Sequence, residues 1–157
     1  MKKITSIVAL SGLVFASCSE DKTTTEPTDE IVGKWVPKNV ELIQVVKLYE
    51  YDYPHTVGCD KDFLDIQSTT QGTFTHFSGT ECKAKVASQA FSKEGSDVKL
   101  NLNGVEVSGK ATFSGNQMYI TGSLGDYTTF FQEYFPEYAS MISMLSGATV
   151  KMTFDKK

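Results

Sequence analysis

The amino-acid sequence predicts an all-β domain, built as an eight-stranded antiparallel up-and-down barrel with a short helical insertion before the last strand. Short runs of alternating apolar and polar residues, separated by turn residues, follow one another from Ile31 onward. Asn103-Gly104, the strongest two-residue hairpin signal, stands between two such runs. The length of 157 residues suits one domain. A meander of eight strands closes readily on itself, which removes free sheet edges and leaves room for one small ligand.

Residues 1–17 are predicted to be a lipoprotein signal peptide. Lys2 and Lys3 precede thirteen uncharged and mostly apolar residues, Ile4 to Ala16, a stretch too short to span a bilayer. The order Phe15-Ala16-Ser17-Cys18 resembles a bacterial lipobox, which implies cleavage before Cys18 and lipidation of its thiol. The alternative is a buried first helix with an ordinary cysteine, but this segment has neither a cap nor an amphipathic stripe.

The residues that follow Cys18 indicate a tether and a destination. Ser19-Glu20-Asp21-Lys22 resembles the acidic surface-export signal of Bacteroidota lipoproteins, and it equally suits the start of a solvated linker. Thr23 to Glu30 holds no apolar residue, so residues 18–30 are expected to be a lipidated cysteine and a disordered tether. Serine directly after the cysteine resembles lipoproteins sorted to the outer membrane. We therefore expect a lipid-anchored protein of the bacterial outer membrane, on its periplasmic or its extracellular face.

Composition and charge exclude several functions. The formal net charge is −4, and all fifteen basic residues are lysine, which argues against a nucleic-acid partner. Two histidines and three cysteines leave little for a metal site or a nucleophile with its base, and the sequence contains none of the common catalytic motifs. We expect no enzyme, no cofactor and no metal. His55 falls in a loop, and the aspartates at positions 60, 62 and 65 suit a solvated hairpin end better than a calcium loop.

The strands are justified by the registers of their hairpins. Across Asn103-Gly104, Leu100 faces Val107, and across the preceding turn Phe91 faces Leu100. Across the turn at residues 114–117, Phe113 faces Met118. The eight predicted strands are a long first region from Gly33 to about Tyr51, then Phe63–Gln67, Thr73–Phe77, the strand around Phe91, Val98–Leu102, a strand from Val105 to Phe113, the strand after Gln117, and Thr149–Phe154.

A disulfide follows from the second hairpin. A Gly-containing turn between its strands predicts that Phe63 faces Phe77. Extending this register outward brings Cys59 level with Glu81, one residue from Cys82. In an exported protein, two cysteines at the open end of a hairpin indicate a disulfide, here worth roughly 3 kcal/mol.

Gly33-Lys34-Trp35 on the first strand matches the G-x-W signature of lipocalins. With Cys59-Asp60-Lys61-Asp62-Phe63-Leu64-Asp65-Ile66, the later Gly72-Thr73-Phe74, Cys82 and the final Val150-Lys151-Met152-Thr153-Phe154, residues 31–157 resemble the lipocalin-like domain of Bacteroidota lipoproteins. The resemblance implies a barrel-closing role for Gly33 and Trp35. It also implies a basic residue over the tryptophan, which here must be a lysine such as Lys151.

Residues 127–146 are predicted to form one or two short helices. Aromatic residues recur there at helical spacing, Pro136 suits a first turn, and an apolar stripe follows before Gly147. Such a stripe commonly belongs to the core, which favours a helix that closes one end of the barrel. The alternative is a mobile lid, or an aromatic patch that engages a ligand or a partner.

Two functions are compatible with these features. In the first, the barrel binds a small hydrophobic ligand, and its inward face consists of Phe74, Phe91, Leu100, Val107, Phe113 and Met118. In the second, the barrel is filled and serves as an interaction or structural module that contacts an envelope protein, a surface protein or a glycan. The residues expected to line the ligand or form the lid are Phe74, His76, Phe91, Phe113, Phe130, Phe131, Tyr134 and Tyr138.

Overall fold

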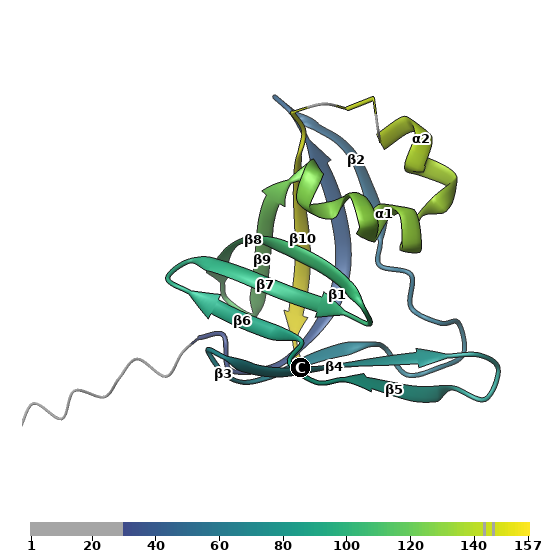
Figure 1. Cartoon of the computed structure of the whole chain (residues 1–157), viewed down its shortest axis with the longest axis vertical. Helices are drawn as coiled ribbons and strands as arrows, with labels where there is room; N and C mark the ends of the chain where they lie inside the picture. The colour runs from purple at the N-terminus through teal and green to yellow at the C-terminus, as the bar shows by residue number, and fades with distance from the viewer. Residues whose placement is uncertain (1–29, 143, 146) are drawn as a thin grey trace, which may run out of the picture.

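The computed structural model describes residues 30–142, 144, 145 and 147–157 (Figure 1). The predicted signal peptide, the predicted lipidation site Cys18 and nearly all of the predicted tether lie outside the described residues. Within the described ranges, no helix is both long and apolar enough to cross a membrane.

Ten antiparallel strands form one curled sheet in the described part of the chain (Figure 1). They are β1 (Gly33–Ile43), β2 (Lys47–Asp52), β3 (Phe63–Ser68), β4 (Gln71–Ser78), β5 (Lys83–Ala87), β6 (Phe91–Glu94), β7 (Asp97–Leu102), β8 (Val105–Ser114), β9 (Gln117–Ser123) and β10 (Thr149–Lys156). The order in the sheet is β5-β4-β3-β1-β10-β9-β8-β7-β6, and β2 pairs with β1. The all-β prediction is confirmed, and the number of eight strands is wrong.

Two features of the sequence account for the difference in strand number. The predicted first strand region is a hairpin of β1 and β2, in which Leu42 pairs with Tyr49. Its turn, Gln44-Val45-Val46, contains none of the residues that usually mark a turn. β5 was not predicted because it is exposed along almost its whole length and lacks the alternation of a half-buried strand.

The predicted registers of β6, β7, β8 and β9 are confirmed, because Phe91 pairs with Leu100, Leu100 with Val107 and Phe113 with Met118. The register of β3 and β4 is wrong by two residues, since Phe63 pairs with Thr75. The turn lies at residues 69–70, and Gly72 belongs to β4. A Cβ at Gly72 would lie 2.7 Å from the Cβ of Phe91. The glycine therefore permits close contact between β4 and β6 and does not form the turn.

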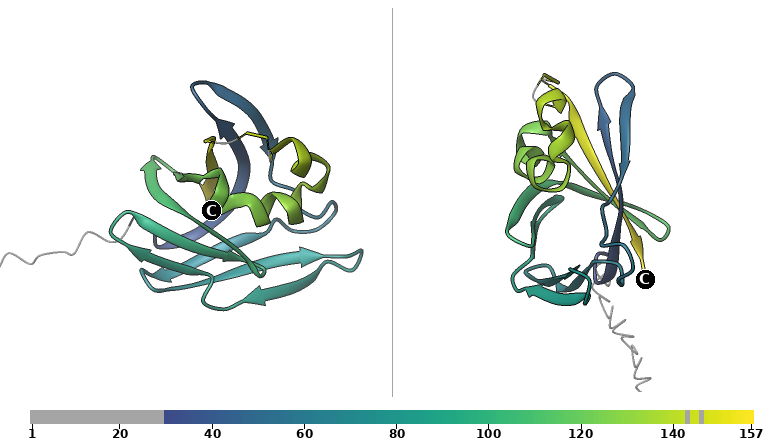
Figure 2. Two further views of the ribbon diagram at one scale, coloured as in Figure 1. Left: turned by 45° about the horizontal axis from the view of Figure 1, so that its top comes forward. Right: turned by 90° about the vertical axis from the view of Figure 1, so that its right-hand side faces the viewer.

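The curl brings distant strands together. β1 and β10 pair along most of their length, so the first and last strands of the domain are neighbours. The far edge of the sheet returns toward β4, where the N–H of Ala90 donates to the Gly72 carbonyl at 2.8 Å and the N–H of Lys93 to the Thr69 carbonyl at 2.7 Å. β5 continues past this contact, so the sheet is a curled half-barrel with β4 and β6 adjacent at one end, where the sequence predicted a closed barrel (Figure 2).

Side chains of the concave face form a continuous core, and five of the six predicted inward residues are at most 2% exposed. They are Phe74, Phe91, Leu100, Val107 and Met118, whereas Phe113 is half-buried. The predicted helical insertion is confirmed and covers one end of this core (Figures 1 and 2). It consists of η1 (Leu124–Tyr127), α1 (Thr128–Tyr134), η2 (Pro136–Tyr138) and α2 (Ala139–Ile142), with Pro136 in the first turn of η2.

Candidate functional site

The two ends of the curled sheet differ in chemistry. At one end, Trp35 is 1% exposed, and its Nε1 donates to the Ile31 carbonyl at 2.6 Å. The Nζ of Lys156 lies 5.0 Å from the centre of the Trp35 ring. A lysine thus covers the tryptophan, but it is Lys156 and not Lys151. Lys151 pairs with Glu41, on the other strand of the β1–β10 ladder.

A surface groove of about 570 Å³ opens beside Trp35. Phe113 lines this groove, and its ring centre lies 5.9 Å from that of Trp35. Phe113 is therefore at the end opposite the insertion, because β10 runs from the insertion at Thr149 to the Trp35 pairing at Lys156. It does not share a site with the predicted lid residues.

Six rings meet at the other end, between the β2 region and the insertion. We call them the aromatic cluster: Tyr51, Tyr53, Phe130, Tyr134, Phe135 and Tyr138. Tyr51 lies 4.7 Å from Tyr138 and 5.4 Å from Phe135, measured between ring centres. Tyr53 lies 5.6 Å from Tyr134, which in turn stacks on Phe130 at 4.9 Å. Rings at these distances contribute attraction beyond the burial of their area.

The hydroxyl groups of Tyr51 and Tyr53 are buried in this cluster, and neither forms a hydrogen bond of standard geometry among the described residues, although Tyr134 and Asp62 lie near the Tyr53 hydroxyl. Tyr53 is only 4% exposed as a whole. Burial raises the pKa of Tyr53 far above its ordinary value of 10, and the nearby Tyr134 hydroxyl and Asp62 carboxylate raise it further, so the phenol stays protonated. By contrast, the Tyr134 hydroxyl donates to the Leu102 carbonyl at 3.2 Å.

A buried carboxylate lies beside the cluster. Asp62 is fully buried, with Oδ2 2.8 Å from His76 Nδ1 and Oδ1 accepting the N–H of Phe77 at 2.9 Å. The N–H of Asp62 donates to His55 Nδ1 at 3.1 Å, so His55 Nε2 is the nitrogen that donates to the Pro37 carbonyl at 2.9 Å. The expectation of a solvated hairpin end is therefore wrong for Asp62. Its hydrogen bonds link the start of β3 to the loop that carries His55 and to β4.

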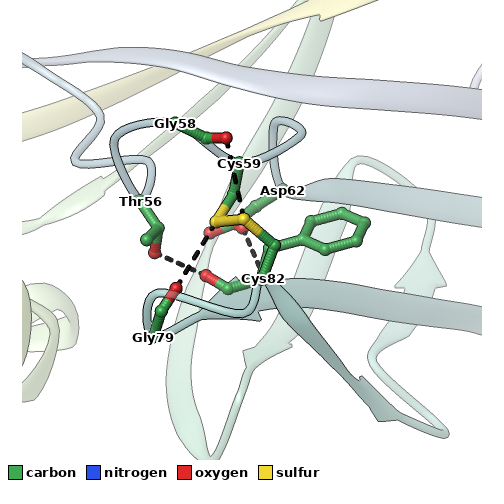
Figure 3. Close-up of a disulfide and its surroundings, with 7 residues drawn as sticks. Thr56, Gly58, Cys59, Asp62, Gly79 and Cys82 are labelled. Atoms are coloured by element: carbon green, nitrogen blue, oxygen red, sulfur yellow. Dashed lines mark hydrogen bonds between the residues drawn. A yellow bond between two sulfur atoms is a disulfide. The ribbon is translucent and has the colours of Figure 1, made fainter.

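The disulfide between Cys59 and Cys82 is confirmed, with an S–S distance of 2.01 Å. It joins the loop before β3 to the turn between β4 and β5, and it lies close to Asp62, the residue before β3 (Figure 3). Thr56 Oγ1 donates to the Phe77 carbonyl and adds a second link between the same segments. The loop that carries His55 and Asp62 is thereby fixed to β4.

The structure brings together only some of the predicted site residues. Phe130, Tyr134 and Tyr138 join the aromatic cluster, while Phe74 and Phe91 lie in the core and Phe131 adjoins the cluster through Phe130 and Phe135. The half-buried His76 bonds to Asp62.

Sequence reasoning missed Tyr51, Tyr53 and Asp62 as members of a site, and Phe135 belongs to the aromatic run of the insertion but is not among the expected lid residues. The alternation Tyr49-Tyr51-Tyr53 was the available signal for two of them, because residues two apart on a strand share a face.

A cavity of about 260 Å³ lies between α1 and α2, and Thr128, Phe131, Ile142 and Leu145 are among its lining residues. Phe131 separates it from the cluster, since its ring centre is 5.7 Å from Phe130 and 5.8 Å from Phe135. In the described part of the chain, no group of three or more histidine, cysteine, aspartate or glutamate residues is arranged to hold a metal ion.

No protein-family model matches the chain, and neither a curated protein nor a solved structure matches it. The function must therefore be argued from the side chains themselves.

Proposed function

We propose that the protein is a noncatalytic, lipid-anchored protein of the bacterial cell envelope that binds a small, mostly apolar molecule at the aromatic cluster. In this proposal the insertion is a lid that moves to admit the ligand. The lipocalin-like resemblance supports a ligand-binding barrel, and so do the pairing of β1 with β10 and the position of Lys156 over Trp35. The filled concave face argues for a site at the end of the sheet and against one in its middle.

The observation that carries the proposal is the buried Tyr53 hydroxyl, which forms no hydrogen bond of standard geometry among the described residues. Leaving a buried donor unsatisfied costs about 1–3 kcal/mol, and most such groups in proteins are paired. A ligand with a hydrogen-bond acceptor would remove this cost, and Tyr51 offers a second donor two residues away. The cavity between α1 and α2 gives space for the lid to repack around an apolar body.

Mass spectrometry of the full chain purified from native membranes in a neutral detergent tests this function. A small apolar molecule should co-purify with the wild type and be depleted in the Tyr53→Phe variant. Tyr127→Phe is the matched control, because Tyr127 is equally buried but its hydroxyl donates to the Ile120 carbonyl at 3.3 Å. The proposal is wrong if no molecule accompanies the wild type, or if Tyr53→Phe retains as much of it as Tyr127→Phe does.

A second candidate function is an interaction module, which the β1–β2 hairpin favours. At its tip Val45 is 99% exposed and Val46 is 64% exposed, and the hairpin projects beyond the rest of the sheet (Figure 2). Exposed adjacent aliphatic residues at a projecting tip suit contact with a partner protein. Under this function, Val45→Ser with Val46→Ser abolishes a crosslink to one envelope protein in intact cells. Val57→Ser, at an equally exposed loop residue, should leave that crosslink unchanged.

A further inference from the structure

The electrostatics of the aromatic cluster restrict the charge of its ligand. The insertion carries Asp126, Glu133 and Glu137, and the sequence from residue 118 to residue 150 contains no lysine and no arginine. Lys47 on β2 and Lys151 on β10 both form ion pairs with glutamates of β1 or β2, and Lys156, the other lysine of β10, lies over Trp35 at the opposite end. Asp62 adds a buried carboxylate close to the Tyr53 hydroxyl, with His76 Nδ1 2.8 Å from its Oδ2.

The aromatic rings of the cluster, like these negative charges, favour a cationic ligand. The faces of tyrosine and phenylalanine rings attract cations, and several faces around one desolvated ammonium contribute about 0.5–2 kcal/mol each. A carboxylate ligand would need a lysine or arginine to offset its desolvation. The described interactions of the cluster include rings, phenols, Asp62 and the imidazole of His55, whose ring centre lies 4.8 Å from that of Tyr53, but no lysine. Burial lowers the pKa of His55 and so favours its neutral form.

We propose that the aromatic cluster, with the buried Asp62 beneath it, selects an amphiphile with an ammonium or other cationic head over one with a carboxylate head. This inference rests on the ligand-binding function proposed above and specifies the chemical class of the ligand. The cationic head lies among the rings of Tyr51, Tyr53 and Tyr138, and the apolar body lies under the insertion. A polar acceptor next to the cationic head takes the free phenol hydroxyl.

Three probes with the same twelve-carbon chain test the inference: dodecyltrimethylammonium, dodecanol and dodecanoate. Each is titrated below its critical micelle concentration into the full chain carrying Cys18→Ser, with binding measured by calorimetry. The ammonium probe should bind at least about tenfold more tightly than dodecanoate, since about 1.4 kcal/mol corresponds to that factor and lies within the range for cation–ring attraction. Dodecanol should bind between the two.

Matched variants distinguish binding of the ammonium probe at the aromatic cluster from its general attraction to an acidic protein. Tyr138→Leu keeps an apolar side chain but removes a ring face, so it should weaken the ammonium probe several-fold and leave dodecanol unchanged. Glu137→Gln should weaken the ammonium probe, while Glu94→Gln, which removes the same charge at the distant tip of the β6–β7 hairpin, should not (Figure 1).

The outcomes distinguish the two proposals. If dodecanoate binds as tightly as the ammonium probe, or if Glu94→Gln weakens binding as much as Glu137→Gln does, the charge selectivity is wrong and the ligand-binding function stands. If none of the three probes binds, the proposed function fails together with this inference.

Discussion

Two buried tyrosines of this protein, Tyr53 and Tyr127, differ in the hydrogen bonding of their hydroxyl groups. The Tyr127 hydroxyl donates to the Ile120 carbonyl, whereas the Tyr53 hydroxyl forms no hydrogen bond of standard geometry, although Tyr134 and Asp62 lie near it. We therefore expect the hydroxyl groups of these two buried tyrosines to contribute differently to the stability of the fold. The unsatisfied one is retained at a cost in stability, which is the pattern expected of a residue kept for binding.

The Tyr53→Phe variant without ligand should be as stable as the wild type or more stable, because it loses an unsatisfied buried donor. Tyr127→Phe should be destabilised by about 1 kcal/mol, because it loses a hydrogen bond. Denaturant unfolding of both variants measures the difference. A loss of stability in Tyr53→Phe equal to or larger than that in Tyr127→Phe would contradict this interpretation.

His55 should make the folding stability depend on pH. Partial burial lowers its pKa below 6.5, although its bond to Pro37 and the charge of Asp62 oppose this effect. Protonation of Nδ1 would also break the bond from the Asp62 N–H. The unfolded chain therefore binds the proton first as the pH falls below 6.5, and the folded state loses stability in that range.

Replacing His55 with Gln tests this dependence, since an amide can accept from Asp62 and donate to Pro37 without titrating. The unfolding free energy of the wild type should fall relative to that of His55→Gln as the pH is lowered through and below 6.5. A difference between the two proteins that stays constant with pH, or that moves in favour of the wild type, would show that His55 is not held neutral.

At the scale of elements, β8 and β9 approach each other closely at a glycine. A Cβ on Gly122 would lie 2.3 Å from the Ser108 carbonyl oxygen and 2.9 Å from Cε2 of Tyr127. Gly122→Ala should thus destabilise the fold by about 1–3 kcal/mol or more, since backbone must move to admit one methyl group. Thermal unfolding should show no such loss for Gly125→Ala, whose Cβ would have an ordinary 3.5 Å contact with Ser123 Oγ. Equal melting temperatures for the two variants would refute this account of Gly122.

The disulfide joins the loop before β3 to the turn between β4 and β5, and its loss should affect that region first. Cys59→Ser with Cys82→Ser should lower the unfolding free energy by about 3 kcal/mol, mainly by freeing the unfolded chain. Hydrogen exchange should increase most at the N–H groups of Asp62 and Phe77, which bond within the stapled loop. Uniform acceleration over all strands would mean that the disulfide does not hold this loop in particular.

The sequence predicts elements well where hairpins are local and alternation is clear. The Asn103-Gly104 hairpin and its neighbours have the expected register, because each has a recognisable turn and one buried face. The β1–β2 turn was missed because valines occupy it, and the register of β3 and β4 was wrong because Gly72 serves a contact with β6. Only the second error comes from a contact between segments that are distant in the sequence.

The candidate site was harder to predict than the strands. The aromatic residues of the insertion were recognised from their helical spacing, but their partners come from β2 and the loop after it, more than seventy positions earlier in the sequence. Asp62 is acidic and flanked by charged residues, so local sequence favours solvent for it, while tertiary contacts bury it. Burial of this kind follows from the packing of distant segments.

Over the whole molecule, the two ends of the curled sheet have separate roles. Lys156 covers Trp35 and also donates to the Glu30 carbonyl at 3.2 Å, so the chain enters the described domain at the tryptophan end. The aromatic cluster lies at the other end, beneath the insertion that immediately precedes β10. A lipid anchor before residue 30 would therefore attach at the end away from the proposed ligand site.

The central claim is that a ligand binds between the β2 region and the insertion. Intermolecular nuclear Overhauser effects between dodecyltrimethylammonium and the full chain with Cys18→Ser test it most directly. We predict contacts from the probe's methyl and methylene protons to the rings of Tyr51, Tyr53 and Tyr138. Contacts confined to Trp35 and Phe113 beside the groove at the opposite end, or to Val45 and Val46 at the hairpin tip, would contradict the claim.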